Sequence, residues 1–158
     1  MSRYTESVTE PLLQGAIGAY VRAGGKEEDL VVLDAPGSFE LPVLVAGAIR
    51  SGRCDGVVAL GCIIRGETRH DRVLGHAVTQ ALLGLSTQSL VPVGLGVLTV
   101  ESPEQALARA GGDKGNKGAE AMEAVLMTIA SLASLRGATK AARVPRPDKA
   151  RASTGRRV

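Results

Sequence analysis

The chain has 158 residues, the length of one ordinary domain, with 44% hydrophobic residues, 22% charged residues and a formal net charge of +3. Two cysteines are too few for a disulfide framework, and no apolar run approaches the ~18 residues that cross a membrane. The first ten residues lack the basic and apolar parts of a secretory signal, so we expect a cytoplasmic protein.

The chain alternates between helical and extended hydrophobic patterns. Apolar residues at helical spacing, with a capped start at Ser102 and a glycine stop at Gly111, predict helices over residues 8–23, 41–49, 70–90, 103–110 and 117–135. Short apolar runs predict buried strands over residues 29–34, 56–64 and 91–99. None of these runs alternates with polar residues, so each strand should be covered on both faces, as in a parallel sheet. The order predicts an α/β fold, and because no strand precedes the first helix, we expect a further strand ahead of Ser2.

Ligands bind at the carboxyl ends of strands in open parallel sheets, and His70 follows the second predicted strand in the first turn of a helix. Its imidazole suits general acid–base catalysis, although the local pattern alone favours an exposed polar residue. His76 lies on another face of that helix, so we expect no metal site. Thr68 and Asp71 have the spacing of a capping box, which would leave N–H groups free for an anion.

Only three aromatic residues are present, so Val, Leu, Ile and Ala must build the core. Tyr4 precedes the first helix, and Phe39 follows a Pro36-Gly37 turn at a strand end. The two rings are either core residues or the walls of a site for a flat heterocycle, which stacks favourably on aromatic faces. Glu40 could accept hydrogen bonds from the N–H groups of such a ring, or it could only favour the helix start.

Two segments are rich in positive charge. Residues 109–118 contain four glycines and three cations, which fit either a phosphate cradle or a solvated turn, and we favour the turn. Residues 136–158 carry eight Lys or Arg and one Asp, so the basic charge lies in a tail. We expect one domain over residues 1–136 and a disordered basic tail over residues 137–158, which we interpret as a solubilising extension rather than a nucleic-acid-binding segment.

Several motifs in order resemble the lumazine synthase (6,7-dimethyl-8-ribityllumazine synthase) family. Residues 36–42, PGSFELP, are similar to that family's PG-[SA]-[FW]-E-[IL]-P segment. Residues 61–70, GCIIRGETRH, resemble its G-x-[VIL]-I-R-G-[AE]-T-x-H signature. The match continues through three further segments, residues 92–99, 104–111 and 115–118. Together they cover about residues 2–135.

The resemblance implies a three-layer α/β/α sandwich with a flavodoxin-like parallel sheet. It also implies the condensation of 5-amino-6-(D-ribitylamino)uracil with 3,4-dihydroxy-2-butanone 4-phosphate in riboflavin biosynthesis. The product is 6,7-dimethyl-8-ribityllumazine, phosphate and water are released, and no cofactor is needed. In this family a central strand precedes the segment that matches Arg3 and Tyr4, so the resemblance implies a start upstream of Met1.

The resemblance also assigns roles to individual residues. It implies that His70 is the acid–base group. It implies a phosphate site made by Glu67, Thr68, Arg109 and Lys117. It implies a pyrimidine and ribityl site made by Tyr4, Ser38, Phe39, Glu40, Cys62, Ile63, Ile64 and Leu95. Leu95 replaces a frequent Phe of the family.

The family's pocket lies between the subunits of a pentamer, so the resemblance implies that Arg109 comes from a neighbouring copy. Some members assemble into sixty-subunit capsids, and an association with riboflavin synthase is a further expectation. A non-catalytic shell or cargo-binding assembly of the same fold is the alternative function. Retention of His70 and Arg109 favours the enzyme, because a shell needs neither residue. Thr5, Arg69, Arg72 and Asp113 depart from common family residues and bear on substrate affinity.

Overall fold

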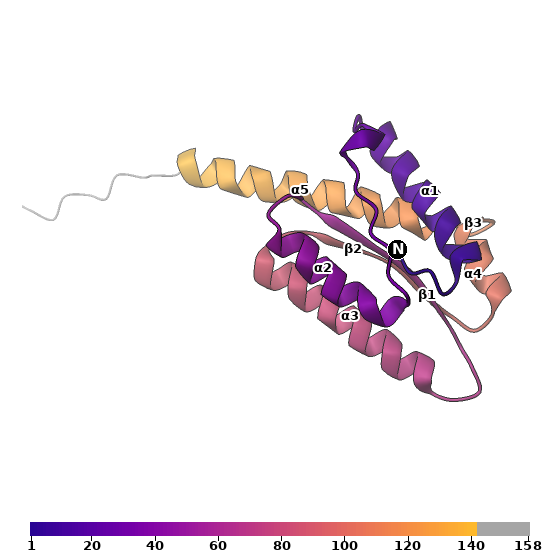
Figure 1. The fold of residues 1–158 in the computed structure, drawn as a ribbon. Coiled ribbons are helices and arrows are strands. Elements are labelled where there is room, and N and C mark those ends of the chain that lie inside the picture. The colour runs from indigo at the N-terminus through magenta and orange to yellow at the C-terminus, as the bar shows by residue number, and fades with distance from the viewer. Residues whose placement is uncertain (142–158) are drawn as a thin grey trace, which may run out of the picture.

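A computed structural model describes the backbone of residues 1–141 and the side chains of residues 1–135 (Figure 1). Its elements in chain order are α1 (Glu6–Arg22), the short 3-10 helices η1 (Glu27–Asp29) and η2 (Ser38–Glu40), α2 (Leu41–Arg50), β1 (Val57–Ile64), α3 (His70–Ser89), β2 (Val93–Val100), α4 (Pro103–Arg109), β3 (Ala110–Gly112), β4 (Gly115–Asn116) and α5 (Lys117–Ala141). The predicted helices and the predicted strands over residues 56–64 and 91–99 are confirmed, with small shifts of their ends.

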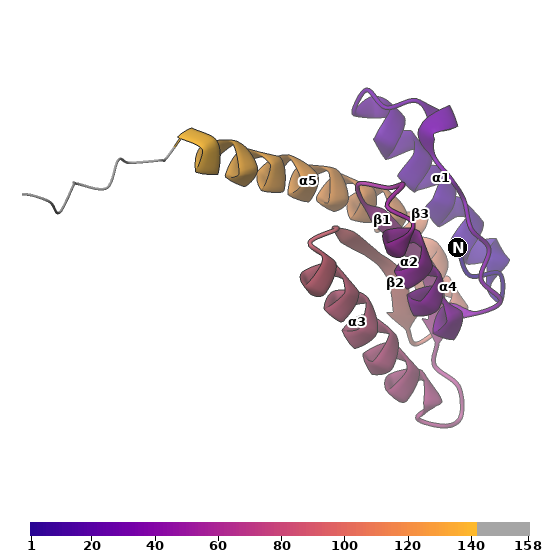
Figure 2. The ribbon, with the colours of Figure 1, turned by 60° about the vertical axis from the view of Figure 1, so that its left-hand side comes forward.

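Strands β1 and β2 pair in parallel, from Val57 opposite Val93 to Ile64 opposite Val100. Helices α2 and α3 cover one face of this ladder, and α1 and α5 cover the other (Figures 1 and 2). Strand β1 is apolar on both sides because Leu60 packs in the core cluster with α1 and α5, whereas its neighbour Ala59 packs in the cluster with α2 and α3. The prediction of an α/β chain with a parallel sheet is therefore confirmed.

Strand β2 is less covered than its sequence predicts. Its residues alternate in burial, and Leu95 is 49% exposed. Within the described residues β2 has no strand on its far side, so it is the edge of the sheet and α3 covers only part of its face. The expectation that both faces of this strand are buried is wrong at Leu95.

The predicted buried strand over residues 29–34 is wrong. Residues 30–34 form no strand, and Val31 is 81% exposed. The reason is the lack of a pairing partner: in the described part of the chain, only a single parallel bridge between Ser2 and Ala35 joins this region to another segment in the manner of a strand. A strand without a neighbour leaves its backbone groups to water and has no ladder to hold it flat.

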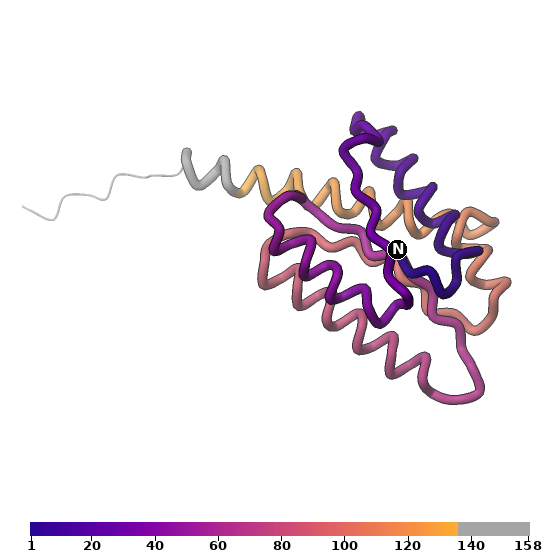
Figure 3. Tube along the Cα trace, viewed as in Figure 1, coloured from indigo at the N-terminus to yellow at the C-terminus, as the bar shows by residue number. Residues whose placement is uncertain are grey.

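Residues 1–3 lie between Ala35 and β1 (Figure 3). The Ser2 N–H donates to the Leu60 carbonyl at 2.9 Å, and the Arg3 N–H donates to the Ala35 carbonyl at 2.8 Å. The Met1 amino group donates to the Leu33 carbonyl, and its partial burial lowers its pKa. Beyond this point no backbone hydrogen bond within residues 1–141 joins residues 30–33 to the first half of β1. We call this unpaired stretch, between residues 30–33 and the first half of β1, the open slot.

Helix α5 begins after the tight β3–β4 turn. The Asn116 side chain accepts hydrogen bonds from the N–H groups of Gly118 and Ala119 and donates to the Pro11 carbonyl, which fixes the helix start against α1. This capping role supports the turn interpretation of residues 109–118. By length and composition alone, residues 117–135 could cross a membrane, as core helices of soluble proteins also can, and Val125 is buried against the sheet.

Helix α5 continues to Ala141 and therefore includes the first residues of the segment for which we expect disorder. The rest of the expected tail, residues 142–158, lies outside the described residues. Met127, on the outer side of α5, is 71% exposed.

The two predicted helix starts differ in outcome. Ser102 caps α4 as predicted, because its hydroxyl accepts a hydrogen bond from the Gln105 N–H at 3.4 Å. The predicted capping box at Thr68 and Asp71 is wrong. Helix α3 begins at His70 with Arg69 as its N-cap, and no side chain makes the cap hydrogen bond there. The N-cap position falls one residue later than the capping-box spacing requires, so the Thr68 hydroxyl accepts from the His70 N–H at 3.4 Å instead.

The contact between α1 and α5 generates a stability prediction. A Cβ atom on Gly118 would lie 2.0 Å from the Leu12 carbonyl oxygen, which is backbone and cannot swing away. We expect Gly118→Ala to cost about 1–3 kcal/mol of unfolding free energy, measured by urea denaturation. Gly47→Ala is the matched control, because this helical glycine has open space around its Cβ position, and it should be neutral or stabilising. Equal midpoints for the two variants would contradict the described packing.

The two cysteines should differ in reactivity. Burial raises the pKa of the Cys62 thiol in β1 to about 11, and it also raises the pKa of Cys54, which is only partly buried. The thiolate is the reactive form, so iodoacetamide at pH 8 should modify Cys54 much faster than Cys62 in the folded protein. Mass spectrometry of digested samples measures both rates, and the rates should become similar in urea. Equal rates in the folded protein would show that the Cys62 side chain is accessible.

Candidate active site

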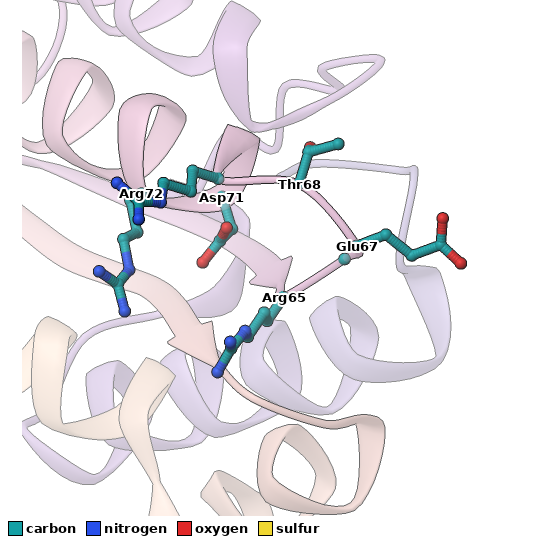
Figure 4. Close-up of a pocket in the computed structure, with 7 residues that line it drawn as sticks. Arg65, Glu67, Thr68, Asp71 and Arg72 are labelled. Carbon is teal, nitrogen blue, oxygen red and sulfur yellow. The ribbon is translucent and has the colours of Figure 1, made fainter.

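The loop between β1 and α3 forms a pocket of about 230 Å³ at the carboxyl end of the sheet (Figure 4). It is lined by Arg65, Gly66, Glu67, Thr68, Arg69, Asp71 and Arg72. The Arg65 N–H donates to the Val100 carbonyl at 2.8 Å, which extends the ladder by one step. The Arg65 guanidinium pairs with Glu101 at 2.5 Å, so the ends of both strands are tied together beneath the loop.

The start of α3 offers hydrogen-bond donors to an anion. Within the described residues, the N–H groups of Asp71 and Arg72 have no backbone or side-chain partner. No side chain caps the helix, and the positive end of its dipole faces the loop. His70, the first residue of the helix, is exposed, but it is not among the residues that line this pocket.

The side chains of Glu67 and Thr68 project outward from the tip of the loop, whereas Arg72 lies on its other side (Figure 4). A ligand at the loop would therefore meet backbone groups of residues 67–68 more directly than their side chains. Arg65, Arg69 and Arg72 all line this pocket, and our sequence analysis missed them as site residues. The cluster of charges directly after the predicted strand was the available signal.

The short helix η2 packs beside the second half of β1. A Cβ atom on Gly61 would lie 2.8 Å from the Ser38 hydroxyl oxygen, so the absence of a side chain at Gly61 allows this approach. Ser38 is buried, whereas the Phe39 ring is 68% exposed. The Glu40 carboxylate turns back towards Gly37. Residues 38–40 are thus held near the carboxyl half of β1, and η2 also contacts α3.

Tyr4 lies at the end of the segment that enters the sheet. Its side chain is 87% exposed. Just before it, the Arg3 guanidinium hydrogen-bonds the Asp34 carboxylate and holds the pKa of that carboxyl below its usual value. Neither Tyr4 nor Phe39 is a core residue of this chain, so the interpretation of the two rings as core residues is wrong. Both rings are available to a ligand.

Cys62, Ile63 and Ile64 are the last three residues of β1 before the loop. Cys62 and Ile63 are buried and Ile64 is half-buried, so their side chains pack in the core. Only their backbone groups are placed to meet a ligand at the strand end. Because burial raises the pKa of the Cys62 thiol to about 11, this group stays protonated at neutral pH.

Arg109, Lys117 and Leu95 do not line the pocket of this chain. Arg109 ends α4 and donates to the Gln105 carbonyl at 3.0 Å, and Lys117 pairs with Glu120 at the start of α5. Leu95 lies opposite Ala59, five residues before the strand ends, which is about 16 Å away along the sheet. A single chain therefore assembles only part of the predicted set. No group of His, Cys, Asp or Glu within the described residues could hold a metal ion.

Comparisons with known proteins identify the family of the chain. The family model for 6,7-dimethyl-8-ribityllumazine synthase matches residues 1–133. A 6,7-dimethyl-8-ribityllumazine synthase of Chlorobium limicola is 43% identical over 118 residues, which cover 73% of this chain and 76% of that protein. Proteins with the same name from Chlorobaculum tepidum, covered to the same extent, and from Nautilia profundicola, with 72% and 76% covered, are each 41% identical. The chain therefore belongs to the 6,7-dimethyl-8-ribityllumazine synthase family, whose enzymes act in riboflavin biosynthesis.

Proposed function

We propose that the condensation characteristic of this family takes place at the carboxyl edge of β1 and β2, with His70 as its acid–base group. The observation that carries this proposal is the loop over residues 65–72, where the exposed residue His70 begins a helix whose next two N–H groups have no partner within the described residues. Such a site binds a phosphate and moves protons without a metal ion or a cofactor.

The reaction joins an amine to a ketone and then closes a ring. The 5-amino group of the ribitylaminouracil attacks the carbonyl carbon of the butanone phosphate, and water leaves as the imine forms. Loss of the neighbouring C–H proton then eliminates phosphate and leaves an enol, whose keto form provides a second carbonyl group. The ribityl-bearing nitrogen attacks this carbonyl carbon, which closes the second ring with loss of its oxygen as a second water. His70 transfers protons in these steps, and the donors at the start of α3 stabilise the departing phosphate. Glu67 and Thr68 contribute their backbone N–H groups to the same phosphate site.

The flat pyrimidine fits between exposed aromatic surfaces. We place Tyr4 and Phe39 against its two faces, because both rings are largely exposed and flat heterocycles stack on aromatic faces. Ser38 and Glu40 accept or donate hydrogen bonds to the ring and the ribityl chain. The backbone groups of residues 62–64 complete the recognition of the ring edge.

Arg109, Lys117 and Leu95 enter the site from a neighbouring copy. The family implies a homo-oligomer, and we propose a pentamer in which each pocket lies between two subunits. Two observations support this: these residues do not line the pocket of their own chain, and α2 and α3 leave an apolar groove that includes Val43 and Leu85. Assembly into a sixty-subunit capsid, association with riboflavin synthase and a cytoplasmic location are further proposals that rest on the family alone.

The open slot leads us to propose a wider sheet. An extended strand seated between residues 30–33 and the first half of β1 would pair with both and would give the flavodoxin-like parallel arrangement of a three-layer sandwich. The direction is set by the parallel bridge between Ser2 and Ala35.

Subunit complementation tests where Arg109 acts. We expect His70→Ala and Arg109→Ala each to lower kcat by about 100-fold or more, as measured by the absorbance of the lumazine product above the spontaneous rate. Unfolding and reassembling the two variants together should restore about a quarter of the wild-type rate, because that share of pockets has both residues intact in a cyclic assembly. No recovery, with oligomers of native size, would contradict a pocket shared between copies. A wild-type rate equal to the spontaneous rate would contradict the proposed function.

A strand-extension experiment tests the open slot. We expect a chain preceded by five consecutive valines to melt about 5 °C or more above the chain that starts at Met1, because new ladder bonds and apolar contacts form. The same extension with a central proline is the control, since proline lacks an N–H donor. Hydrogen exchange at residues 30–33 should slow only with the all-valine extension. Equal melting of both extended chains would contradict a strand-accepting slot.

A further inference from the structure

Arg3 and Asp34 form a two-point ion pair that joins two distant parts of the chain. The Arg3 Nε atom donates to Asp34 Oδ1 at 2.9 Å, and Nη2 donates to Oδ2 at 3.1 Å. This side-by-side arrangement fixes the relative orientation of the two side chains as well as their separation, because the planar guanidinium matches the planar carboxylate. The third guanidinium nitrogen, Nη1, bonds Glu6 in the first turn of α1.

The backbone strengthens the same connection. The Arg3 N–H donates to the Ala35 carbonyl at 2.8 Å, and the Ala35 N–H donates to the Met1 carbonyl at 2.8 Å. The buried hydroxyl of Thr9 donates to the Ser2 carbonyl at 2.7 Å, which fixes the segment against α1. The residues around Arg3 and Asp34 are therefore held in one register.

Each partner of the ion pair precedes one of the two exposed rings in the chain. Tyr4 follows Arg3 directly, and Phe39 follows Asp34 by five residues, across the Pro36-Gly37 turn. Neither ring is anchored by burial, because both side chains are largely exposed. The direction of each ring therefore depends on the backbone that carries it. The Arg3–Asp34 pair is the side-chain link that joins those two backbones.

We propose that Arg3 and Asp34 are positioning residues that set the separation of Tyr4 and Phe39, and thereby the affinity for the flat heterocyclic substrate. This proposal rests on the proposed function, and it assigns the pair no contact with the substrate. The pair contributes little to global stability, because both side chains are solvent-exposed and exposed ion pairs are weak. Its effect should instead be local, on the mobility of the segment that carries Tyr4.

The sequence offers a direct probe of that mobility. Trp is absent and only two tyrosines are present, so a Tyr20→Phe background leaves Tyr4 as the only tyrosine. Time-resolved fluorescence anisotropy then reports the motion of Tyr4 alone. The variants are Asp34→Ala, Arg3→Ala and the exchanged pair Arg3→Asp with Asp34→Arg. Arg22→Ala is the matched control, since it removes an exposed ion pair that joins α1 to α5 and lies outside the site.

We expect Asp34→Ala and Arg3→Ala to increase the fast anisotropy decay of Tyr4. Both variants should also raise KM for the ribitylaminouracil by about three- to tenfold, because loss of this surface ion pair weakens the contacts of both rings with the substrate. The KM for the butanone phosphate and kcat should stay within about twofold of wild type. The exchanged pair should recover part of both effects, and Arg22→Ala should show neither.

Unchanged Tyr4 anisotropy and unchanged pyrimidine KM in Asp34→Ala would overturn the proposal. A parallel rise in both KM values with a fall in kcat would also overturn it, because it would indicate general structural damage. A wild-type chain without condensation activity would refute the proposed function, and the anisotropy of the Asp34→Ala variant would then still decide whether the pair holds Tyr4 in place.

Discussion

The in-register parallel pairing of β1 with β2 is the constraint on which the rest of the structure depends. The two strands end together, at Ile64 and Val100, and the Arg65 N–H adds one more bond to the Val100 carbonyl. The chain must therefore leave the sheet through a loop at its carboxyl edge before α3 can begin. That geometry brings the helix start, its free donors and His70 to the place where η2 also approaches β1. A shift of this register would break the bond between Arg65 and Val100 that joins the loop to the end of β2.

The opposite edge of β1 explains the least regular part of the molecule. Within the described part of the chain it is paired only where residues 1–3 reach Leu60, so no strand lies beside residues 30–34, of which residues 31–34 are exposed. Tyr4 follows these three residues directly. The position of the Tyr4 backbone and the unpaired edge of β1 therefore both depend on one short contact. Both should respond when that contact is strengthened.

The sequence predicted the helices and the two paired strands well, because their apolar periodicity reflects local burial. It failed for residues 29–34, where an apolar run suits a buried strand but only a neighbouring strand can bury it. It also placed the α3 cap too early, since cap geometry depends on one residue's backbone angles rather than on spacing. For the site, the motifs picked out the residues that follow the strands. They could not show which of these residues meet in one chain, because the positions of Arg109 and Leu95 relative to the loop depend on tertiary structure.

We propose that the pyrimidine and the phosphate bind at the carboxyl edge of β1 and β2, and a crystal structure of the assembled protein with the ribitylaminouracil and inorganic phosphate would show where each of them lies. We expect the ring between Tyr4 and Phe39 and the phosphate against the N–H groups at the start of α3, with Arg109 of a neighbouring copy within hydrogen-bonding distance. A phosphate held in the turn over residues 111–115, or a ring bound away from both aromatic side chains, would contradict the account.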